Sequence, residues 1–134
     1  MTPAELISYC LAKNGAYEDH PFGPDSVIIK VGRTESRSGR IFAQVFRLKG
    51  QDMATLNCEP MTGDFYRSQY PGVVVRGYHC PPVQQPYFNT FPLDGKVPDS
   101  VICEMADHSY QAVVAKLPKA VQRLLAAGQK GETL

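Results

Sequence analysis

The 134-residue sequence has no tryptophan, no closely paired cysteines and no long apolar run. Its four cysteines are scattered and none stands in a C-x-x-C pair, so we expect neither a zinc site nor a disulfide framework. No apolar run approaches the ~20 residues of a membrane-spanning helix, which excludes a membrane role. No N-terminal stretch joins a basic region to an apolar run and a cleavage site. The sequence therefore predicts a reduced, cytoplasmic protein.

Strong net charge is missing too, because 14 Lys and Arg balance 13 Asp and Glu to give +1. The whole molecule thus has little long-range field for polyanions. Neither of the common glycine-rich phosphate-binding motifs is present. The carboxylates have no acid/base spacing, and Cys80 beside His79 points the opposite way on an extended segment. We therefore expect no enzymatic activity, no cofactor and no metal.

Helix and strand patterns alternate along the chain. Thr2, Pro3 and Glu5 form a capping pattern that predicts a helix ending at Gly15. A second helix is expected over residues 98–116, with Asp99 near its start, and a short one after Pro118. A further short helix is expected over residues 61–69. Strands are expected over residues 26–31, 41–48, 53–58, 73–75 and 87–91.

This order of elements predicts an α+β fold with two layers: an antiparallel sheet of about five strands with helices packed on one face. The length of 134 residues suits one domain with its own core. We expect that domain to span residues 1–128, followed by a frayed tail over residues 129–134.

Positive charge is concentrated in residues 30–49, where six basic residues stand against Glu35 alone. The local charge is +5, and the remaining eight basic and twelve acidic residues sum to −4. The connection between the strands expected over residues 26–31 and 41–48, VGRTESRSGR, is rich in Gly and Ser. It has the form of a basic wing that could reach a phosphate backbone. An ordinary hairpin with solvated arginines is the alternative. The candidate nucleic-acid contacts are Lys30, Arg33, Arg37, Arg40, Arg47 and Lys49.

A second candidate surface is a groove formed by residues 76–89. Its aromatic residues could stack on bases of a single strand, or they could fill the core. Asn89 and Thr90 could equally be a polar pair that holds a turn. The candidate groove residues are Arg76, Tyr78, His79, Phe88 and Asn89.

Three segments together resemble the MmcQ/YjbR family of small bacterial proteins: YPGVV and GYH within residues 70–79, FNTFPLDGKVPD at 88–99, and DHSY with VVAKLPK within 107–119. PFGPDSVIIKV at residues 21–31 supports the resemblance, which covers about residues 2–119. It implies an antiparallel sheet with helices on one side, a fold likened to secretion chaperones. It also implies a double-wing DNA-binding arrangement and no established reaction.

Two departures from the family pattern bear on function. The TESRSG insert at residues 34–39 lengthens the wing connection. The segment CPPVQQPYFNT at residues 80–90 has prolines and glutamines where family members often carry a basic run ending in tryptophan. The first departure adds charge, and the second removes about half of the cationic surface that the resemblance implies.

Two hypotheses about function follow. The first is weak DNA binding through the basic wing, without base-specific readout and with strong salt dependence. The second is a protein-binding adaptor or chaperone-like module that uses the open sheet face or an edge strand. The sequence indicates no oligomeric state.

Overall fold

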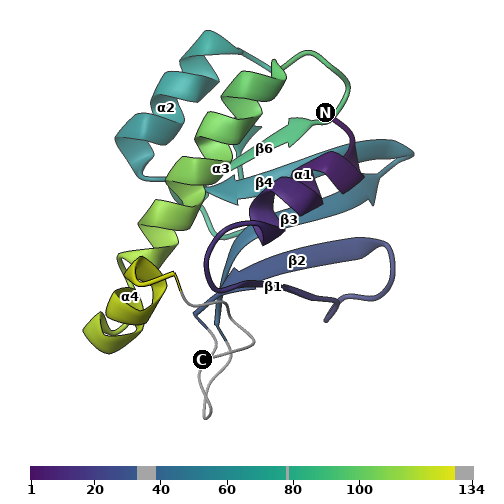
Figure 1. Ribbon diagram of the computed structural model, residues 1–134. Coiled ribbons are helices and arrows are strands. Elements are labelled where there is room, and N and C mark those ends of the chain that lie inside the picture. Colours follow the sequence, from purple (N-terminus) through teal and green to yellow (C-terminus); the bar gives the residue numbers. More distant parts are fainter. Residues whose placement is uncertain (33–38, 78, 129–134) are drawn as a thin grey trace.

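The structure is a computed structural model that describes residues 1–32, 39–77 and 79–128. The described chain forms one antiparallel sheet and helices that cover one of its faces (Figure 1). The strands are β1 (Ala16–Asp19), β2 (Ser26–Val31), β3 (Arg40–Leu48), β4 (Gln51–Asn57), β5 (Val75–Arg76) and β6 (Phe88–Pro92). The helices are α1 (Pro3–Leu11), α2 (Pro60–Gln69), α3 (Asp99–Val114) and α4 (Lys119–Ala126), with a 3-10 turn η1 (Gln85–Tyr87). The predicted α+β class is confirmed.

The sheet has six strands in the order β1-β2-β3-β4-β6-β5, one more than predicted. The missing strand in the prediction was β1, which pairs with β2 from Ala16 opposite Val31 to Asp19 opposite Ile28. β1 is only four residues long and ends in two acidic residues, so it lacks the apolar alternation that marks a strand in a sequence. Its pairing with β2 makes it an edge of the sheet.

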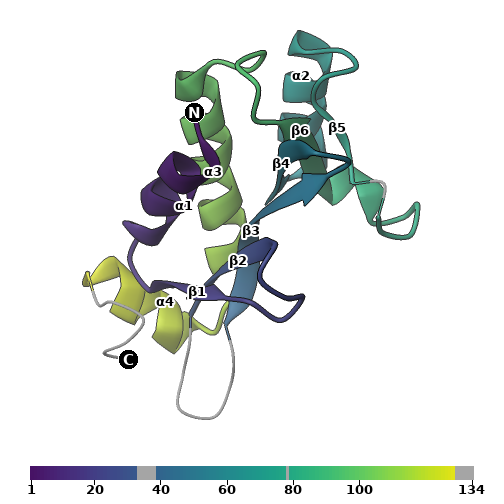
Figure 2. The same cartoon turned by 90° about the vertical axis from the view of Figure 1, so that its right-hand side faces the viewer.

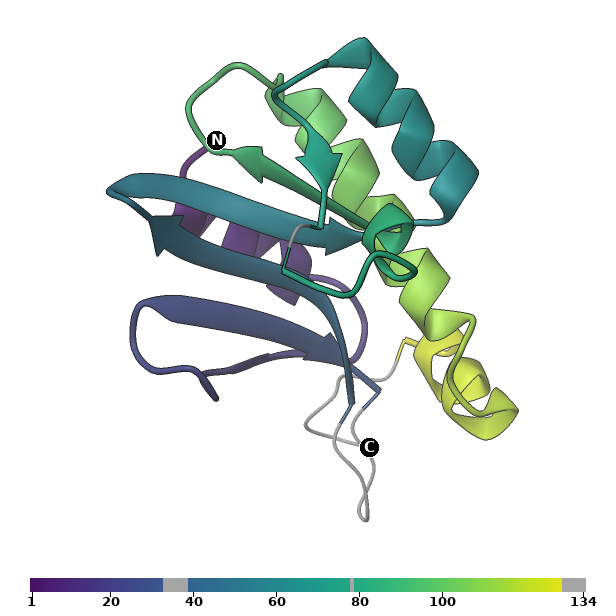
Figure 3. The same cartoon turned by 180° about the vertical axis from the view of Figure 1, so that it is seen from behind.

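Helices α1 and α3 lie on the same side of the sheet, as Figure 2 shows. Apolar side chains from β2, β3, β4 and β6 pack against them because successive strand residues alternate between the two faces. The largest fully buried apolar side chains of this core are Phe42, Phe91, Leu6, Ile29, Leu56 and Ile102. The opposite face of the sheet carries none of the four α-helices in the described structure (Figure 3). No helix of the described residues has the length and hydrophobicity that crossing a membrane requires.

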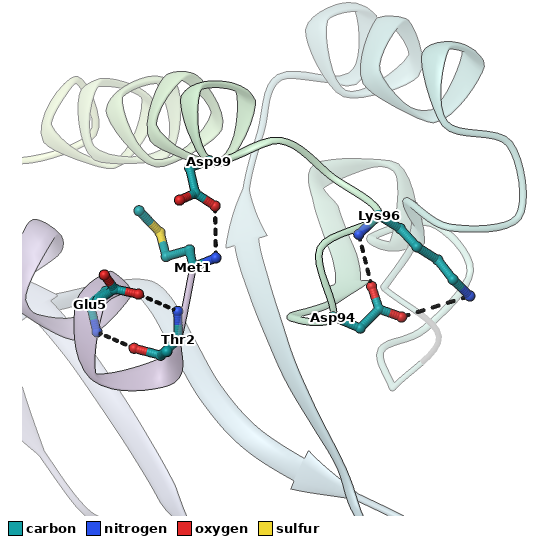
Figure 4. A network of polar contacts seen from close by, with 6 residues as sticks. All are labelled: Met1, Thr2, Glu5, Asp94, Lys96 and Asp99. Carbon is teal, nitrogen blue, oxygen red and sulfur yellow. Dashed lines mark hydrogen bonds and ion pairs between the residues drawn. The ribbon is translucent and has the colours of Figure 1, made fainter.

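The start of α1 is capped as the sequence predicts. The Glu5 amide donates to the Thr2 hydroxyl at 3.1 Å, and the Thr2 amide donates to the Glu5 carboxylate at 2.8 Å. The N-terminal amino group of Met1 contacts Asp99 at 2.7 Å, which ties the start of α1 to the start of α3 (Figure 4). In the same region Asp94 accepts from the Lys96 amide and pairs with its ammonium at 3.7 Å. The capping box and the Met1–Asp99 pair together fix how α1 lies on α3.

Two glycines allow α4 and the end of α3 to approach the sheet. Gly15 has a φ of +75°, and a Cβ there would lie 2.2 Å from Leu125 of α4. Gly32 has a φ of +88°, and its Cβ would lie 2.7 Å from Leu117. Both positions therefore need glycine for backbone conformation and for space.

β3 separates from β4 at one end. The β3–β4 pairing runs from Ala43 to Leu48, whereas Arg40 and Ile41 pair with β2 alone. The register shows the cause: Lys30 lies opposite Ile41 while Ile29 lies opposite Ala43, so Phe42 is an extra residue in β3. Such a bulge bends and twists its strand. β3 therefore separates from β4 beyond the Ala43–Leu56 pair. β4 itself ends at Asn57, which lies opposite Phe88 of β6.

Candidate functional site

A cavity of about 750 Å³ opens on the uncovered sheet face at the end where β3 and β4 part. A cavity of this size falls within the range of ligand-binding sites. We call it the hollow. Its lining comes from β2, β3, β4 and β6, from α3, and from four connections: β1–β2, β2–β3, the segment before η1 and the segment after α3. The lining residues are Phe22, Lys30, Gly39, Arg40, Ile41, Gln44, Phe46, Thr55, Asn57, His79, Phe88, Val113 and Lys116.

The floor of the hollow is polar at its centre. Gln44 lies opposite Thr55 across β3 and β4, and Asn57 lies opposite Phe88 across β4 and β6. The Gln44 amide donates to Ser26 at 3.2 Å, and the Thr55 and Thr90 hydroxyls lie 2.8 Å apart. Among the described residues no hydrogen bond involves the side-chain amide of Asn57. Thr55 is 5% exposed and the Gln44 amide is already bonded, so the donor and acceptor groups left for a ligand are mainly those of the Asn57 side chain.

Apolar and aromatic side chains surround this polar floor. Phe22 is 68% exposed and Ile41 is 39% exposed, which is high for side chains of this kind. Phe46 and Phe88 are half-buried on the same sheet face. The His79 ring meets the Phe88 ring edge to face, with centroids 5.9 Å apart. The hollow thus presents ring surface to anything that enters it.

Among the described lining residues the charged groups are all basic: Lys30, Arg40 and Lys116 are present, and no carboxylate is. Lys30 is already paired with Asp19 at 2.8 Å, and its hydrogen bond lowers the pKa of the Asp19 carboxyl. No ion pair of the described residues involves Arg40 or Lys116, and both are exposed. The Lys116 ammonium lies 5.8 Å from the centre of the Tyr87 ring. The hollow is therefore electropositive although the whole chain is almost neutral.

The structure divides the predicted wing residues between the two ends of β3. Lys30 and Arg40 lie at the hollow, whereas Arg47 and Lys49 lie at the opposite end, roughly 25 Å away at the usual rise of a strand. Arg47 pairs with Asp52 at 2.8 Å and donates to the Gly50 carbonyl at 2.6 Å. The described cations of residues 30–49 therefore do not form one continuous surface. Arg33 and Arg37 lie outside the described residues.

The predicted groove is only partly assembled. His79 and Phe88 line the hollow, but Arg76 is an exposed residue of the edge strand β5 that does not line it. The predicted groove position of Asn89 is corrected by the structure. Asn89 is 2% exposed, and its side chain bonds Arg67 at 2.6 Å and the Gly63 carbonyl at 3.3 Å. It is one residue from Phe88 and so points to the opposite sheet face. Tyr78 lies outside the described residues.

Asn89 belongs to a buried polar cluster that fixes α2 against β6. The Arg67 side chain is 10% exposed and donates to Asn89 and to the Pro60 carbonyl. Cys58 lies beside it, and burial raises the pKa of the Cys58 thiol. In the described part of the chain no group of three or more histidine, cysteine or acidic side chains is placed to hold a metal. The cluster has a structural role: the Asn89 side chain bonds residues of α2 and does not hold a turn.

Sequence reasoning did not single out the other residues of the hollow. Gln44 with Phe46, and Thr55 with Asn57, stand at alternate positions of two predicted strands, so a shared face could be expected from the sequence. That this face is uncovered, and that Phe22 and Lys116 border it, depends on the bulge in β3 and on the path of α3. Tertiary structure alone brings those residues together.

Comparison with known proteins identifies the family. The model of the YjbR family matches residues 11–112. The uncharacterized protein YjbR of Escherichia coli K12 is 30% identical over 125 residues, which cover 93% of this chain and 98% of that protein. The chain belongs to the YjbR family. The same identity and coverage hold for the uncharacterized YjbR of Escherichia coli O157:H7.

Solved structures agree with this assignment. The crystal structure of protein DR2400 of Deinococcus radiodurans, a DUF419 domain, has a TM-score of 0.79 and 28% identity, covering 93% of this chain and 91% of that one. A protein from Pseudomonas syringae has a TM-score of 0.65 at 21% identity, covering 84% and 99%, which shows the fold alone. The YjbR fold of the chain is thus supported by both sequence and structure.

Proposed function

We propose that this YjbR-family protein is a non-enzymatic, weak nucleic-acid-binding module whose contact surface is the hollow. One observation supports the proposal most: the described lining residues combine Lys30, Arg40 and Lys116 with aromatic rings, and none of them is a carboxylate. Proteins that bind single-stranded nucleic acid without sequence preference commonly combine basic side chains with aromatic rings on which bases stack. Arg40 is the described residue that joins the predicted wing to the hollow.

Low affinity follows from the number of cations. Only Arg40 and Lys116 are exposed cations of the hollow without an acidic partner in the described structure, because Asp19 compensates Lys30. Each neutralised phosphate adds affinity and steepens the dependence on salt. Two or three contacts therefore give binding that is measurable at low salt and weak at physiological salt.

The test is fluorescence anisotropy of labelled DNA, single-stranded and duplex, at low and at physiological salt. The variant R40Q/K116Q removes two positive charges at the hollow, and the control R47Q/K49Q removes two at the opposite end of β3. We expect the first variant to weaken binding at least about tenfold and the second to leave it nearly unchanged. Circular dichroism confirms that both variants fold.

Two results would reject this proposal. Absence of binding to either DNA form at low salt would exclude nucleic acid as the ligand. Equal weakening by the two variants would mean that binding depends on total charge and has no site at the hollow.

Protein binding is the second candidate function, and exposed apolar side chains beside the edge strand β5 favour it. Val75 is 37% exposed, Val83 79% and Tyr87 45%. An extended peptide could add a strand to β5 through main-chain hydrogen bonds. An apolar peptide that binds, and that loses affinity when its alternate amides are methylated, would support this function over the first.

A further inference from the structure

We infer that the ligand of the hollow is single-stranded nucleic acid, with unpaired bases inside the hollow and phosphates at its basic rim. The inference deepens the proposed function and rests on it. It names the form of nucleic acid and the part of it that each group of residues contacts.

The shape of the site excludes the bases of an intact duplex. The hollow is a cavity of about 750 Å³ between strands that part, with Gln44, Thr55 and Asn57 on its floor. Paired bases are stacked inside a duplex and reach such a floor only after they leave the stack. Unpaired bases can enter directly, and their edges can bond the Asn57 amide, which has no partner in the described structure.

The rings of the hollow suit bases better than they suit a simple polyanion. Phe22 extends from the β1–β2 connection and is 68% exposed, and Phe88 and Phe46 line the same hollow from the sheet. The three rings together form apolar surface within one cavity, which a single exposed side chain does not. Base stacking on aromatic side chains is tolerant of sequence, because every base has a flat face.

The charges lie where a backbone would leave the cavity. Arg40 is at the first residue of β3 and Lys116 follows the last turn of α3, so the two exposed cations come from different elements that border the same hollow. No described residue of the lining is a carboxylate that would repel phosphate at this point. Phosphates at the rim and bases on the floor therefore match the separation of basic and aromatic residues.

An acidic apolar peptide is the strongest rival ligand, because it also joins negative charge to apolar surface. Its main-chain amides can also bond the row Gln44, Thr55 and Asn57, but its aliphatic side chains have no flat face to stack on the rings of the hollow. We therefore assign the site to nucleic acid, and the peptide enters the test as a competitor.

The test compares three labelled ligands of equal length by anisotropy at low salt: oligothymidine, the same strand with abasic sites in place of every base, and an oligothymidine–oligoadenine duplex. The abasic strand keeps the phosphates and loses the bases. We expect it to bind roughly tenfold more weakly than oligothymidine, and the duplex to bind more weakly than the single strand.

A pair of protein variants tests the position of the bases. Phe22→Ala removes a ring of the hollow, and Phe65→Ala removes a ring from α2 that is 56% exposed and is not part of the hollow. Both side chains are exposed, so both variants should fold. We expect Phe22→Ala to lower oligothymidine affinity roughly fivefold to tenfold, with little change in abasic-strand binding, and Phe65→Ala to change neither.

The outcomes separate the inference from the proposed function. Equal affinity for abasic and base-bearing strands, or stronger binding of the duplex, would overturn the single-strand assignment and leave nucleic-acid binding intact. Equal effects of the two phenylalanine variants, or no effect of Phe22→Ala, would overturn the placement of bases in the hollow. Binding of a glutamate- and leucine-rich peptide in place of all three ligands would overturn both.

Discussion

Two asparagines of the sheet show how position decides the role of one residue type. Asn89 is buried on the helix-covered face, where it bonds Arg67 and Gly63. Asn57 lies on the uncovered face, where its backbone amide donates to Ser109 at 2.8 Å and its side chain borders the hollow. The first asparagine stabilises the fold, and the second is available to a ligand.

Replacing Asn89 should therefore cost far more stability than replacing Asn57. Asn89→Ala leaves the buried guanidinium of Arg67 without its 2.6 Å acceptor, and we expect a loss of about 2–3 kcal/mol in the free energy of unfolding. Asn57→Ala should cost less than about 1 kcal/mol. Urea unfolding followed by circular dichroism measures both. Similar losses would show that Arg67 finds another acceptor.

Cys10 predicts a dependence of stability on alkaline pH. Its side chain is fully buried, and burial raises the pKa of the thiol from an ordinary value of 9.0 to about 12. Because the folded pKa is the higher one, the contribution to stability is complete below pH 9 and is lost as pH rises toward 12. Cys10→Ala should flatten the fall of stability over this range, as urea unfolding of the parent and the variant at a series of pH values would show. Equal slopes in the parent and the variant would contradict the effect of burial.

At the scale of single residues, the sequence predicted some roles and missed others for a physical reason. The capping by Thr2 and Glu5 is local, so it could be predicted and is confirmed. The environment of Asn89 depends on α2, which lies more than twenty positions earlier in the chain. A groove role for Asn89 was wrong because neighbouring strand residues face opposite sides of the sheet.

At the scale of elements, the bulge at Phe42 determines where a site can form. It lets residues 40–42 follow β2 while β4 continues toward β6, and the gap between them becomes the hollow. Strand periodicity predicted β3 and β4 but not their separation, because a bulge adds one residue without changing the local apolar pattern. The sequence did not predict β1, because this strand forms through its pairing with β2 and its four residues carry no apolar alternation.

The packing of α4 can be tested through two glycines that share a positive φ. Gly15→Ala places a Cβ 2.2 Å from Leu125, whereas Gly23→Ala meets nothing within 4 Å. Both changes carry the cost of a left-handed conformation, about 1–2 kcal/mol, and Gly15→Ala adds about 1–3 kcal/mol of overpacking. In thermal unfolding, the melting temperature of Gly15→Ala should thus be well below that of Gly23→Ala. Equal melting temperatures would mean that α4 can move away from residue 15 without loss of stability.

At the scale of the whole molecule, net charge is a poor guide to binding. The chain carries +1 overall, yet the charged residues among the described lining of the hollow are all basic. The sequence located an excess of charge in residues 30–49 but could not show that β3 separates its two ends. The fold class could be predicted from element order, whereas the site could not, because it combines residues from five elements and four connections.

A titration of ¹⁵N-labelled protein with oligothymidine at low salt tests most directly whether the hollow is the binding site. We expect amide shift changes grouped at Ile41, Gln44, Thr55, Asn57 and Lys116, with residues 47–50 unaffected. Changes centred on residues 47–50, on α2 or on no surface at all would contradict it.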